Sequence, residues 1–172
     1  QDIAGHIKPS SGEMPKLNGI DIYGDIVPLN GIIGGDHIIY VDFKQRYDLD
    51  ARIQKAKDRG HAHLIPKLEE CRQKAGIVVA DVSGHQITDA LLAAMLHQAF
   101  LMGAMYEMDH YGNITEKLFE NINTRFFNSS SVSKFLTMIY GEISEDVRFK
   151  FLSAGHPMPF VYSSKQNRIV DF

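Results

Sequence analysis

Two aspartates stand in matching sequence contexts that could support metal chemistry. Asp36 follows "GIIGG" and Asp81 follows "GIVVA", so each acid comes at a junction between an apolar run and a glycine-containing turn. Carboxylates brought together from neighbouring strands repel each other unless a positive charge lies between them. Hard divalent cations such as Mg²⁺ or Mn²⁺ supply that charge, because they prefer carboxylate, carbonyl and water oxygens. The alternative is that each acid bonds a local backbone N–H in its own turn.

Three histidines lie near these acids or on apolar elements. His85 is in the glycine turn after Asp81, where it could donate a proton to a leaving oxygen or simply bond the backbone. His156 lies in the tight turn "SAGHP", for which a structural hydrogen bond is expected. His97 lies on an apolar helix face and is expected to be a core histidine with a hydrogen-bond partner.

The elements that must position these residues are strands followed by helices and then strands again. Runs rich in Ile, Val, Tyr and Phe predict strands at 20–29, 37–43, 76–80, 135–143, 148–153, 159–163 and 168–172. The short link "SEDV" predicts that the strands on either side of it are antiparallel.

Two helices are predicted in the middle of the chain. Residues 87–108 are apolar nearly all round, which indicates a helix buried inside a globular core rather than a membrane span. Ile114, Leu118, Ile122 and Phe126 recur every four residues and predict a second helix with one apolar face. Antiparallel strands with two helices grouped between them indicate an α+β fold.

Length and composition indicate one globular domain over residues 1–172, with a formal net charge of -3 that argues against a nucleic-acid partner. The single cysteine, Cys71, excludes an internal disulfide framework. The first residues lack the apolar core of a signal peptide, so we expect a cytoplasmic protein. The chain begins without Met and stops at "NRIVDF" within a strand-like run, so we interpret it as a piece of a larger protein.

Residues 44–75 lie between the two acids and are dense in charge and helical in propensity; we refer to them as the insertion. Within 44–74 lie nine of the 18 Lys and Arg residues, against five acidic ones. Two apolar stripes predict a helical hairpin that turns near Gly60: Leu49, Ile53 and Ala56, then Leu64, Leu68 and Cys71. Its positive field suggests an arm that docks a substrate or forms a dimer; the alternative is a solvated hairpin without a partner.

Five motifs together resemble a known family. They are "GGD" at 34–36, "ADVSGH" at 80–85 followed by "ALLAAML", the Asn of "ENINTRF" at 123, "FLTMIYGEI" at 135–143 and "SAGHPMPF" at 153–160. In this order they resemble the SpoIIE-like bacterial branch of the PPM superfamily of metal-dependent protein serine/threonine phosphatases. The resemblance implies an α-β-β-α sandwich of two packed antiparallel sheets flanked by helices, incomplete at the C-terminal side.

The resemblance also implies a site with two Mn²⁺ or Mg²⁺ ions. Asp81 would bridge both ions, while Asp36 and the backbone carbonyl of Val82 would hold one of them. Water activated by the ions would hydrolyse phosphoserine or phosphothreonine, and His85 is the candidate proton donor.

The family's usual substrate is a phosphorylated protein, often a small anti-sigma-factor antagonist. An upstream sensory or receiver domain is implied, with residues 1–18 as the end of its linker. A homodimer is a further expectation.

Three departures from the family pattern leave alternatives open. Gln86 stands where the family usually has Gly, Ile39 stands where a second Asp is common, with Asp42 the nearest acid, and a downstream "TDG"-like acidic motif is not reached. We therefore expect the chain as given to be weakly active or inactive as a phosphatase. The alternative functions are a catalytically inactive module of this fold that binds partners, or a different metal-dependent phosphoesterase such as a nucleotide phosphatase.

Overall fold

The computed structural model describes residues 14–27, 35–84, 87–129 and 134–170. The first half contains β1 (His37–Asp42), α1 (Phe43–Arg46), α2 (Leu49–Asp58), η3 (Ala62–Leu64), α3 (Ile65–Glu70), η4 (Cys71–Gln73) and β2 (Lys74–Val82). The second half contains α4 (Ile87–Tyr111), α5 (Glu116–Ser129), β3 (Leu136–Ser144), β4 (Phe149–Ala154), β5 (Val161–Ser163) and β6 (Arg168–Val170).

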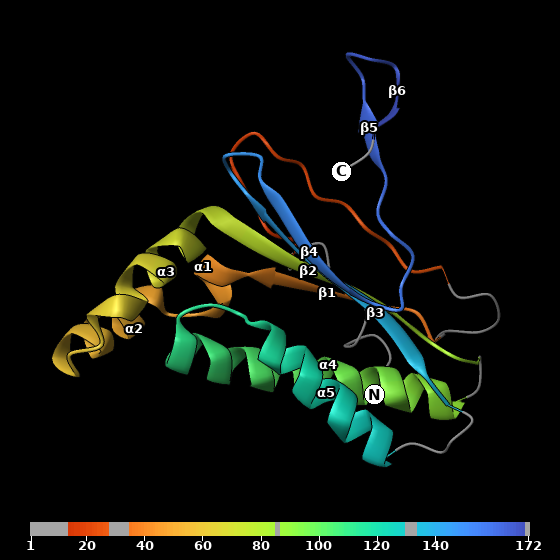
Figure 1. The fold of residues 1–172 in the computed structure, drawn as a ribbon, viewed down its shortest axis with the longest axis horizontal. Coiled ribbons are helices and arrows are strands. Elements are labelled where there is room, and N and C mark those ends of the chain that lie inside the picture. Colours follow the sequence, from red (N-terminus) through yellow and green to blue (C-terminus); the bar gives the residue numbers. More distant parts are fainter. Residues whose placement is uncertain (1–13, 28–34, 85–86, 130–133, 171–172) are drawn as a thin grey trace, which may run out of the picture.

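The strands form two antiparallel sheets, one with the order β1-β2-β3-β4 and one made of β5 and β6. Helices α4 and α5 lie on one face of the four-stranded sheet, and the 14–27 segment lies on its other side (Figure 1). The predicted α+β class with antiparallel sheets is confirmed. The hairpin around "SEDV" is also confirmed, because β3 and β4 pair on either side of it.

The core lies between the four-stranded sheet and α4. Val78 and Ala80 alternate with outward-facing residues on β2, as the two-residue period of a strand requires. From α4, Leu96 and Phe100 pack against this side, and the Phe100 ring lies 5.8 Å from that of Tyr140 on β3. The strands therefore anchor α4 along the sheet.

The predicted strand at 20–29 is wrong over its described part. Residues 21–27 run extended without joining a sheet, and residues 28 and 29 lie outside the described residues. The segment crosses the outer face of the sheet, where a side chain at Gly24 would clash with the Tyr40 hydroxyl and contact Ile38. The alternating apolar pattern thus reflects packing on this face rather than a ladder of backbone hydrogen bonds.

Helix α4 is longer and less buried than predicted. Its inward side is buried, but Leu91, Met95, Met102 and Met105 on the outward side are at least half exposed. The prediction of a helix enclosed in the core is therefore wrong for this side. The all-round apolar character gave no indication of which side the sheet would cover. Within the part of the chain that the structure describes, no helix is both long and apolar enough to cross a bilayer.

The insertion is the predicted helical hairpin, with Gly60 at its turn in a left-handed conformation (φ 70°). All six residues of the two predicted stripes are buried. The hairpin docks on the C-terminal end of α4, where Arg52 and Lys55 both pair with Asp109.

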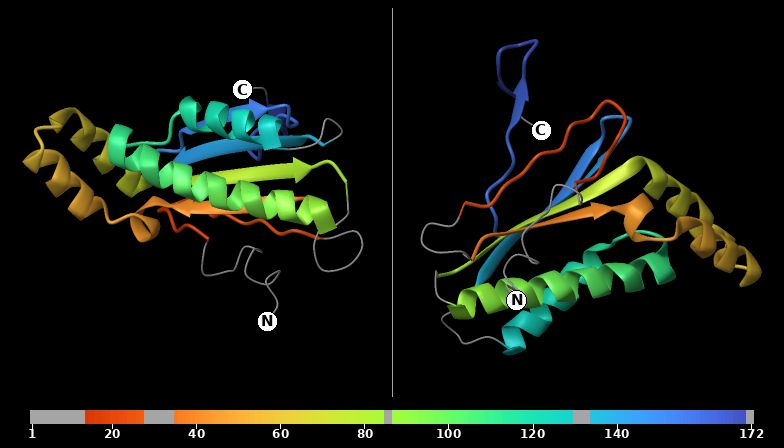
Figure 2. Two further views of the ribbon diagram at one scale, coloured as in Figure 1. Left: turned by 90° about the horizontal axis from the view of Figure 1, so that it is seen from below. Right: turned by 180° about the vertical axis from the view of Figure 1, so that it is seen from behind.

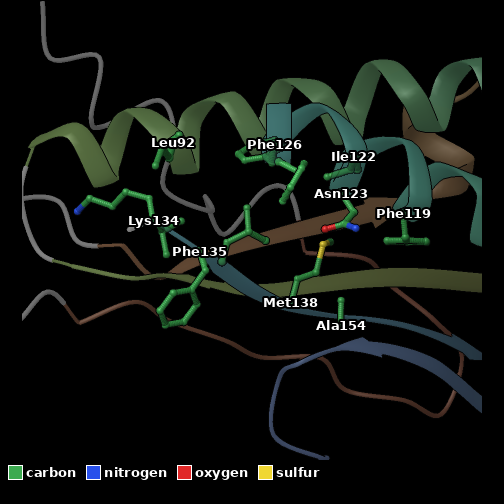
Figure 3. A pocket seen from close by; sticks show the side chains of 12 residues that line it. Leu92, Phe119, Ile122, Asn123, Phe126, Lys134, Phe135, Met138 and Ala154 are labelled. Atoms are coloured by element: carbon green, nitrogen blue, oxygen red, sulfur yellow. The ribbon is translucent and has the colours of Figure 1, made fainter. Parts of the chain in front are cut away.

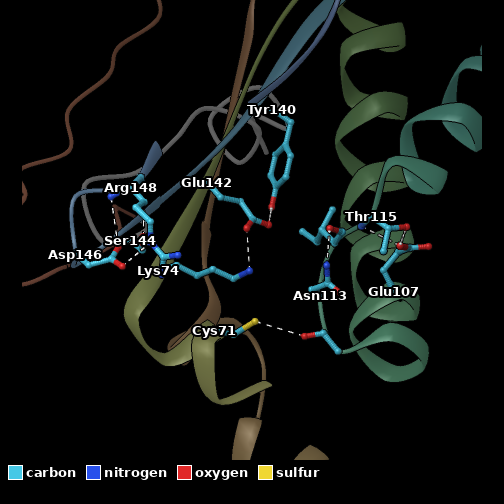
Figure 4. A network of polar contacts seen from close by, with 12 residues as sticks. Cys71, Lys74, Glu107, Asn113, Thr115, Tyr140, Glu142, Ser144, Asp146 and Arg148 are labelled. Atoms are coloured by element: carbon cyan, nitrogen blue, oxygen red, sulfur yellow. Dashed lines mark hydrogen bonds and ion pairs between the residues drawn. The ribbon is translucent and has the colours of Figure 1, made fainter. Parts of the chain in front are cut away.

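A network of charged and polar groups joins the base of the hairpin to the sheet (Figure 4). The Lys74 ammonium lies 2.8 Å from a Glu142 carboxylate oxygen, and the Tyr140 hydroxyl donates to the other oxygen at 2.7 Å. Burial alone would lower the pKa of Lys74, but the Glu142 carboxylate raises it above its ordinary value. Burial also raises the pKa of the Cys71 thiol to about 12, so this cysteine is a protonated core residue at neutral pH.

Candidate active site

The register of β1 and β2 brings the two aspartates face to face. His37 pairs with Ala80, and the Val82 N–H donates to the Gly35 carbonyl at 3.2 Å, so the same register places Asp36 opposite Asp81. Residues directly opposite in an antiparallel pair have Cβ atoms about 4.5–5.5 Å apart, on the same face of the sheet. Both acids are exposed, and neither has a side-chain hydrogen bond or ion pair within the described residues.

Backbone carbonyls converge beside these carboxylates. A side chain at Gly35 would clash with the Val82 carbonyl oxygen and would lie 3.1 Å from that of Gly84. The missing side chain therefore leaves a small space lined by two carbonyl oxygens next to Asp36. Two carboxylates and adjacent carbonyls form the hard oxygen donor set that Mg²⁺ and Mn²⁺ prefer, so the residues present fit such ions.

The turn after Asp81 is held by a buried ion pair that sequence reasoning missed. Asp89, in the first turn of α4, is 0% exposed, and the Lys134 ammonium lies 2.5 Å from its carboxylate. Lys134 also donates to the Ser83 carbonyl at 3.3 Å, and the Ser83 N–H donates to the Phe135 carbonyl at 2.9 Å. The ion pair thus fixes the turn to α4 and to the segment before β3. Its two partners are 45 residues apart, so no local pattern indicated their contact.

A third strand extends the row of polar residues across the same face. Thr137 on β3 pairs with Asp81, and its hydroxyl lies 2.9 Å from Nδ1 of His156. The His156 carbonyl accepts a hydrogen bond from the Ser153 hydroxyl at 2.7 Å. The predicted structural hydrogen bond of His156 is therefore present, and Thr137 is a site residue that the sequence did not single out.

A pair of histidines lies beside Asp36, on the opposite face of β1. His37, which is 3% exposed, places Nε2 at 2.7 Å from Nδ1 of His97 on α4. The predicted hydrogen-bond partner of His97 is thus found. Burial, and then the neighbouring His97, lower the pKa of His37 to about 4. Because His37 stays neutral at pH 7, it adds no positive charge behind the two aspartates.

An apolar pocket of about 340 Å³ opens beside this end of the sheet, between α5 and β3 (Figure 3). Aromatic and aliphatic side chains such as Phe126, Phe135 and Met138 line it, with Asn123 and Lys134 as its polar members. Asn123 is the asparagine of the "ENINTRF" motif, so the pocket connects that motif with the Lys134 ion pair.

The structure describes three of the four site groups expected from the sequence. Asp36, Asp81 and the Val82 carbonyl come together at the ends of β1 and β2, whereas His85 lies outside the described residues. Among the described residues there is no group of three or more His, Cys, Asp or Glu side chains that could hold a metal ion. The metal-binding roles of Asp36, Asp81 and Val82 and the catalytic role of His85 stay predictions.

The fold and this arrangement define an α+β domain with an oxygen-rich site at one end of an antiparallel sheet. The family model described as Stage II sporulation protein E (SpoIIE) matches residues 72–171, and the chain belongs to this family. The chain is also similar to the phosphoserine phosphatase RsbU of Bacillus subtilis (strain 168), with 31% identity over 101 residues. That alignment covers 58% of this chain and 29% of RsbU, so the chain spans less than a third of this relative. Together the comparisons support a phosphatase domain of the PPM type.

Proposed function

We propose that this chain is the catalytic domain of a bacterial signalling phosphatase that hydrolyses phosphoserine or phosphothreonine on a protein. The observation that carries the proposal is the pairing of Asp36 with Asp81 across two strands. Like charges placed directly opposite each other destabilise a sheet. The exposed pair of aspartates therefore does not serve stability, and a bound cation between them is the function that fits their charges.

Each residue has a defined role in this proposal. Asp36, Asp81 and the Val82 carbonyl would hold Mn²⁺ or Mg²⁺, with Asp81 contributing to both of two ions. When bound there, such ions would provide a water molecule of lowered pKa and would neutralise charge on the phosphoryl oxygens. Lys134 and Asp89 position the turn that carries the Val82 carbonyl. His85 donates a proton to the leaving Ser or Thr oxygen.

The family is the basis for the proposed substrate and for the proposed surroundings of the domain. RsbU is a phosphoserine phosphatase by name, so a phosphorylated protein is the proposed substrate here, with an anti-sigma-factor antagonist as the specific candidate. An upstream sensory or receiver domain would control the activity in the cytoplasm.

A catalytically inactive module that binds partners is the second candidate. It is favoured by the absence of a third acidic or histidine side chain beside Asp36 and Asp81 within the described residues. In that case Mn²⁺ would bind weakly, because two carboxylates leave most of its coordination to water.

The test is Mn²⁺-dependent hydrolysis of a phosphoserine peptide by the full-length parent protein, with Mn²⁺ binding followed separately by calorimetry. Asp81→Asn should reduce both hydrolysis and Mn²⁺ affinity by at least about 100-fold, because it removes the bridging carboxylate. Asp58→Asn, an exposed acid on α2, is the matched control and should change neither. Retained hydrolysis in Asp81→Asn would contradict the proposed role. Mn²⁺ binding without hydrolysis in the unsubstituted protein would favour the inactive module.

A further inference from the structure

A small pocket, here called the hairpin pocket, lies where the helical hairpin meets the C-terminal end of α4. Both views in Figure 2 place α2 and α3 at this end of α4. The pocket has a volume of about 190 Å³. Four of its lining residues are buried and apolar: Ala56, Leu64, Leu68 and Met108. Sites for drug-sized ligands measure about 300–1,000 Å³, so this pocket suits a smaller ligand.

The polar wall of the hairpin pocket is basic. Arg52, Lys55 and Arg59 line it from α2 and from the C-cap of this helix. They follow one another at steps of three and four residues, so they lie on one side of the helix. His61 from the hairpin turn and His110 from α4 also line the pocket. Guanidinium, ammonium and imidazole groups from separate elements therefore gather around one small space.

The cations of this wall outnumber its acids. Asp109 is the one carboxylate among the described residues that line the pocket, and Arg52 and Lys55 both pair with it. Arg59 has no ion pair with an acid in the described part of the chain. Three cations thus face one carboxylate, which leaves a surplus of two positive charges when both histidines are neutral.

One donor of the basic wall also lacks an acceptor. Nε of Arg52 is buried and has no hydrogen-bond partner within the described residues, and the side chain as a whole is only 17% exposed. A buried donor without an acceptor costs free energy. An anion in the pocket would bring acceptor oxygens to this guanidinium.

Stabilisation of helix ends does not account for the arrangement. Cations are favourable near the C-terminus of any helix, and Lys57 stands in the last turn of α2 together with Lys55. Lys57, however, does not line the pocket. The helix dipole attracts cations to the end of a helix without selecting a side, so it does not explain why three of them surround Asp109.

We propose that the hairpin pocket binds a phosphate group, as inorganic phosphate or as part of a small phosphomonoester. A phosphate group carries a charge of about -1.5 to -2 at pH 7, which balances the surplus of two. Its oxygens accept from the guanidinium groups of Arg52 and Arg59, in the planar geometry that arginine offers to phosphate, and from the Lys55 ammonium. The bound anion bridges α2 and α4 and strengthens the docking of the hairpin.

This site goes beyond the proposed phosphatase function and does not depend on it. The hairpin pocket lies at the opposite end of β1 and β2 from Asp36 and Asp81, and its lining residues include neither of them. Binding measured in EDTA therefore reads the hairpin pocket alone, because EDTA removes any metal ion that would hold phosphate near the two aspartates.

Calorimetric titration of the protein with inorganic phosphate in EDTA tests the proposal. We expect one phosphate per chain, with saturation at millimolar phosphate, and a rise in melting temperature because the anion binds the folded state. Sodium chloride at equal ionic strength should produce neither effect. The absence of saturable phosphate binding would overturn the proposal.

Single substitutions locate the bound phosphate. Arg59→Gln and Lys55→Gln should each raise the dissociation constant at least about tenfold, because a hydrogen bond to a charged group contributes that much. Lys57→Gln is the matched control, since it removes the same charge from the same helical turn outside the pocket. It should change the dissociation constant by less than about threefold, because exposed charges away from the anion are screened. All three side chains are exposed, so the fold should be retained. An equal loss of binding in Lys57→Gln would show general charge attraction and contradict a site.

Two further titrations distinguish the source of the phosphate. Equal affinity for inorganic phosphate and O-phosphoserine would identify the free ion as the ligand, whereas tighter binding of O-phosphoserine would identify a phosphorylated small molecule. Binding to phosphatidylcholine–phosphatidylglycerol vesicles without saturable binding of either small anion would overturn the proposal, because a membrane surface would then be the partner.

Discussion

The acids at the two ends of the four-stranded sheet are paired differently, although Asp89 at the site end has a cationic partner in Lys134. At the hairpin end, Asp109, Glu142 and Glu69 each pair with Lys or Arg. At the other end, Asp36 and Asp81 face each other and have no cationic side-chain partner within the described residues. Six residues of β1 separate the two ends; at about 3.3 Å each, this is roughly 20 Å.

This difference separates residues that stabilise the fold from residues that are kept for function. The hairpin buries two apolar stripes and neutralises much of its charge on α4 and on itself, so its structure accounts for its composition. The helices α2 and α3 lie at the opposite end of β1 and β2 from the one that carries the two aspartates, which argues against direct docking of a substrate at the site by this arm (Figure 1). The exposed pair of like charges has no such structural account, and local rules are most often broken at functional sites.

The largest loss of stability is expected from a substitution in the apolar core of the hairpin. Leu68→Ala, at a position 1% exposed on α3, should cost about 3 kcal/mol of unfolding free energy, because it leaves a cavity between the hairpin and α4. Chemical denaturation measures the loss. The neighbouring exposed Lys67→Ala should change stability by less than about 0.5 kcal/mol. Mn²⁺ affinity should be unchanged in both variants, and a parallel fall in Leu68→Ala would contradict the separation of the two ends.

A comparable loss of stability is expected at the site end of the sheet when the pH falls, because His37 is buried there. The pKa of His37 is about 4 in the folded protein, below its ordinary value of 6.5, because burial and then His97 disfavour its charged form. The unfolded chain therefore binds more protons, so the stabilisation is full above pH 6.5 and is lost as the pH falls toward 4. The total is about 3 kcal/mol, and denaturation in EDTA at pH 7 and pH 5 should reveal most of it.

Two variants separate His37 from the other titrating groups. His37→Gln should flatten the pH dependence between pH 7 and pH 5, because it removes the buried imidazole. His61→Gln, at an exposed position in the hairpin, should leave the slope unchanged. An unaltered slope in His37→Gln would show that other groups cause the acid sensitivity.

The smallest change in stability is expected when one of the two aspartates is replaced. Asp36→Asn should raise the stability of the metal-free protein by up to about 1 kcal/mol, because it removes the like charge opposite Asp81. With millimolar Mn²⁺ the order should reverse, since the unsubstituted protein gains stability from the bound ion and the variant does not. Thermal melting with EDTA or Mn²⁺ measures both. Destabilisation of metal-free Asp36→Asn would mean that the carboxylate has a structural role.

The sequence by itself determined the elements and the acids at their ends. The stripes of the hairpin, the turn at Gly60 and the apolar run before Asp81 depend on residues a few positions apart, so periodicity and turn chemistry predict them. The "GGD" and "ADVSGH" motifs identified Asp36 and Asp81 in the same way, since each motif is contiguous.

Only the tertiary structure decided which of these residues meet and which faces stay uncovered. The Asp36–Asp81 pair depends on strand register, Asp89 finds Lys134 across 45 residues, and His37 finds His97 across 60. The described part of the strand expected at 20–29 packs on a sheet without joining it. Helix α4 has apolar residues on both sides but a sheet on one. Composition records how apolar a segment is, whereas burial depends on what the rest of the chain places against it.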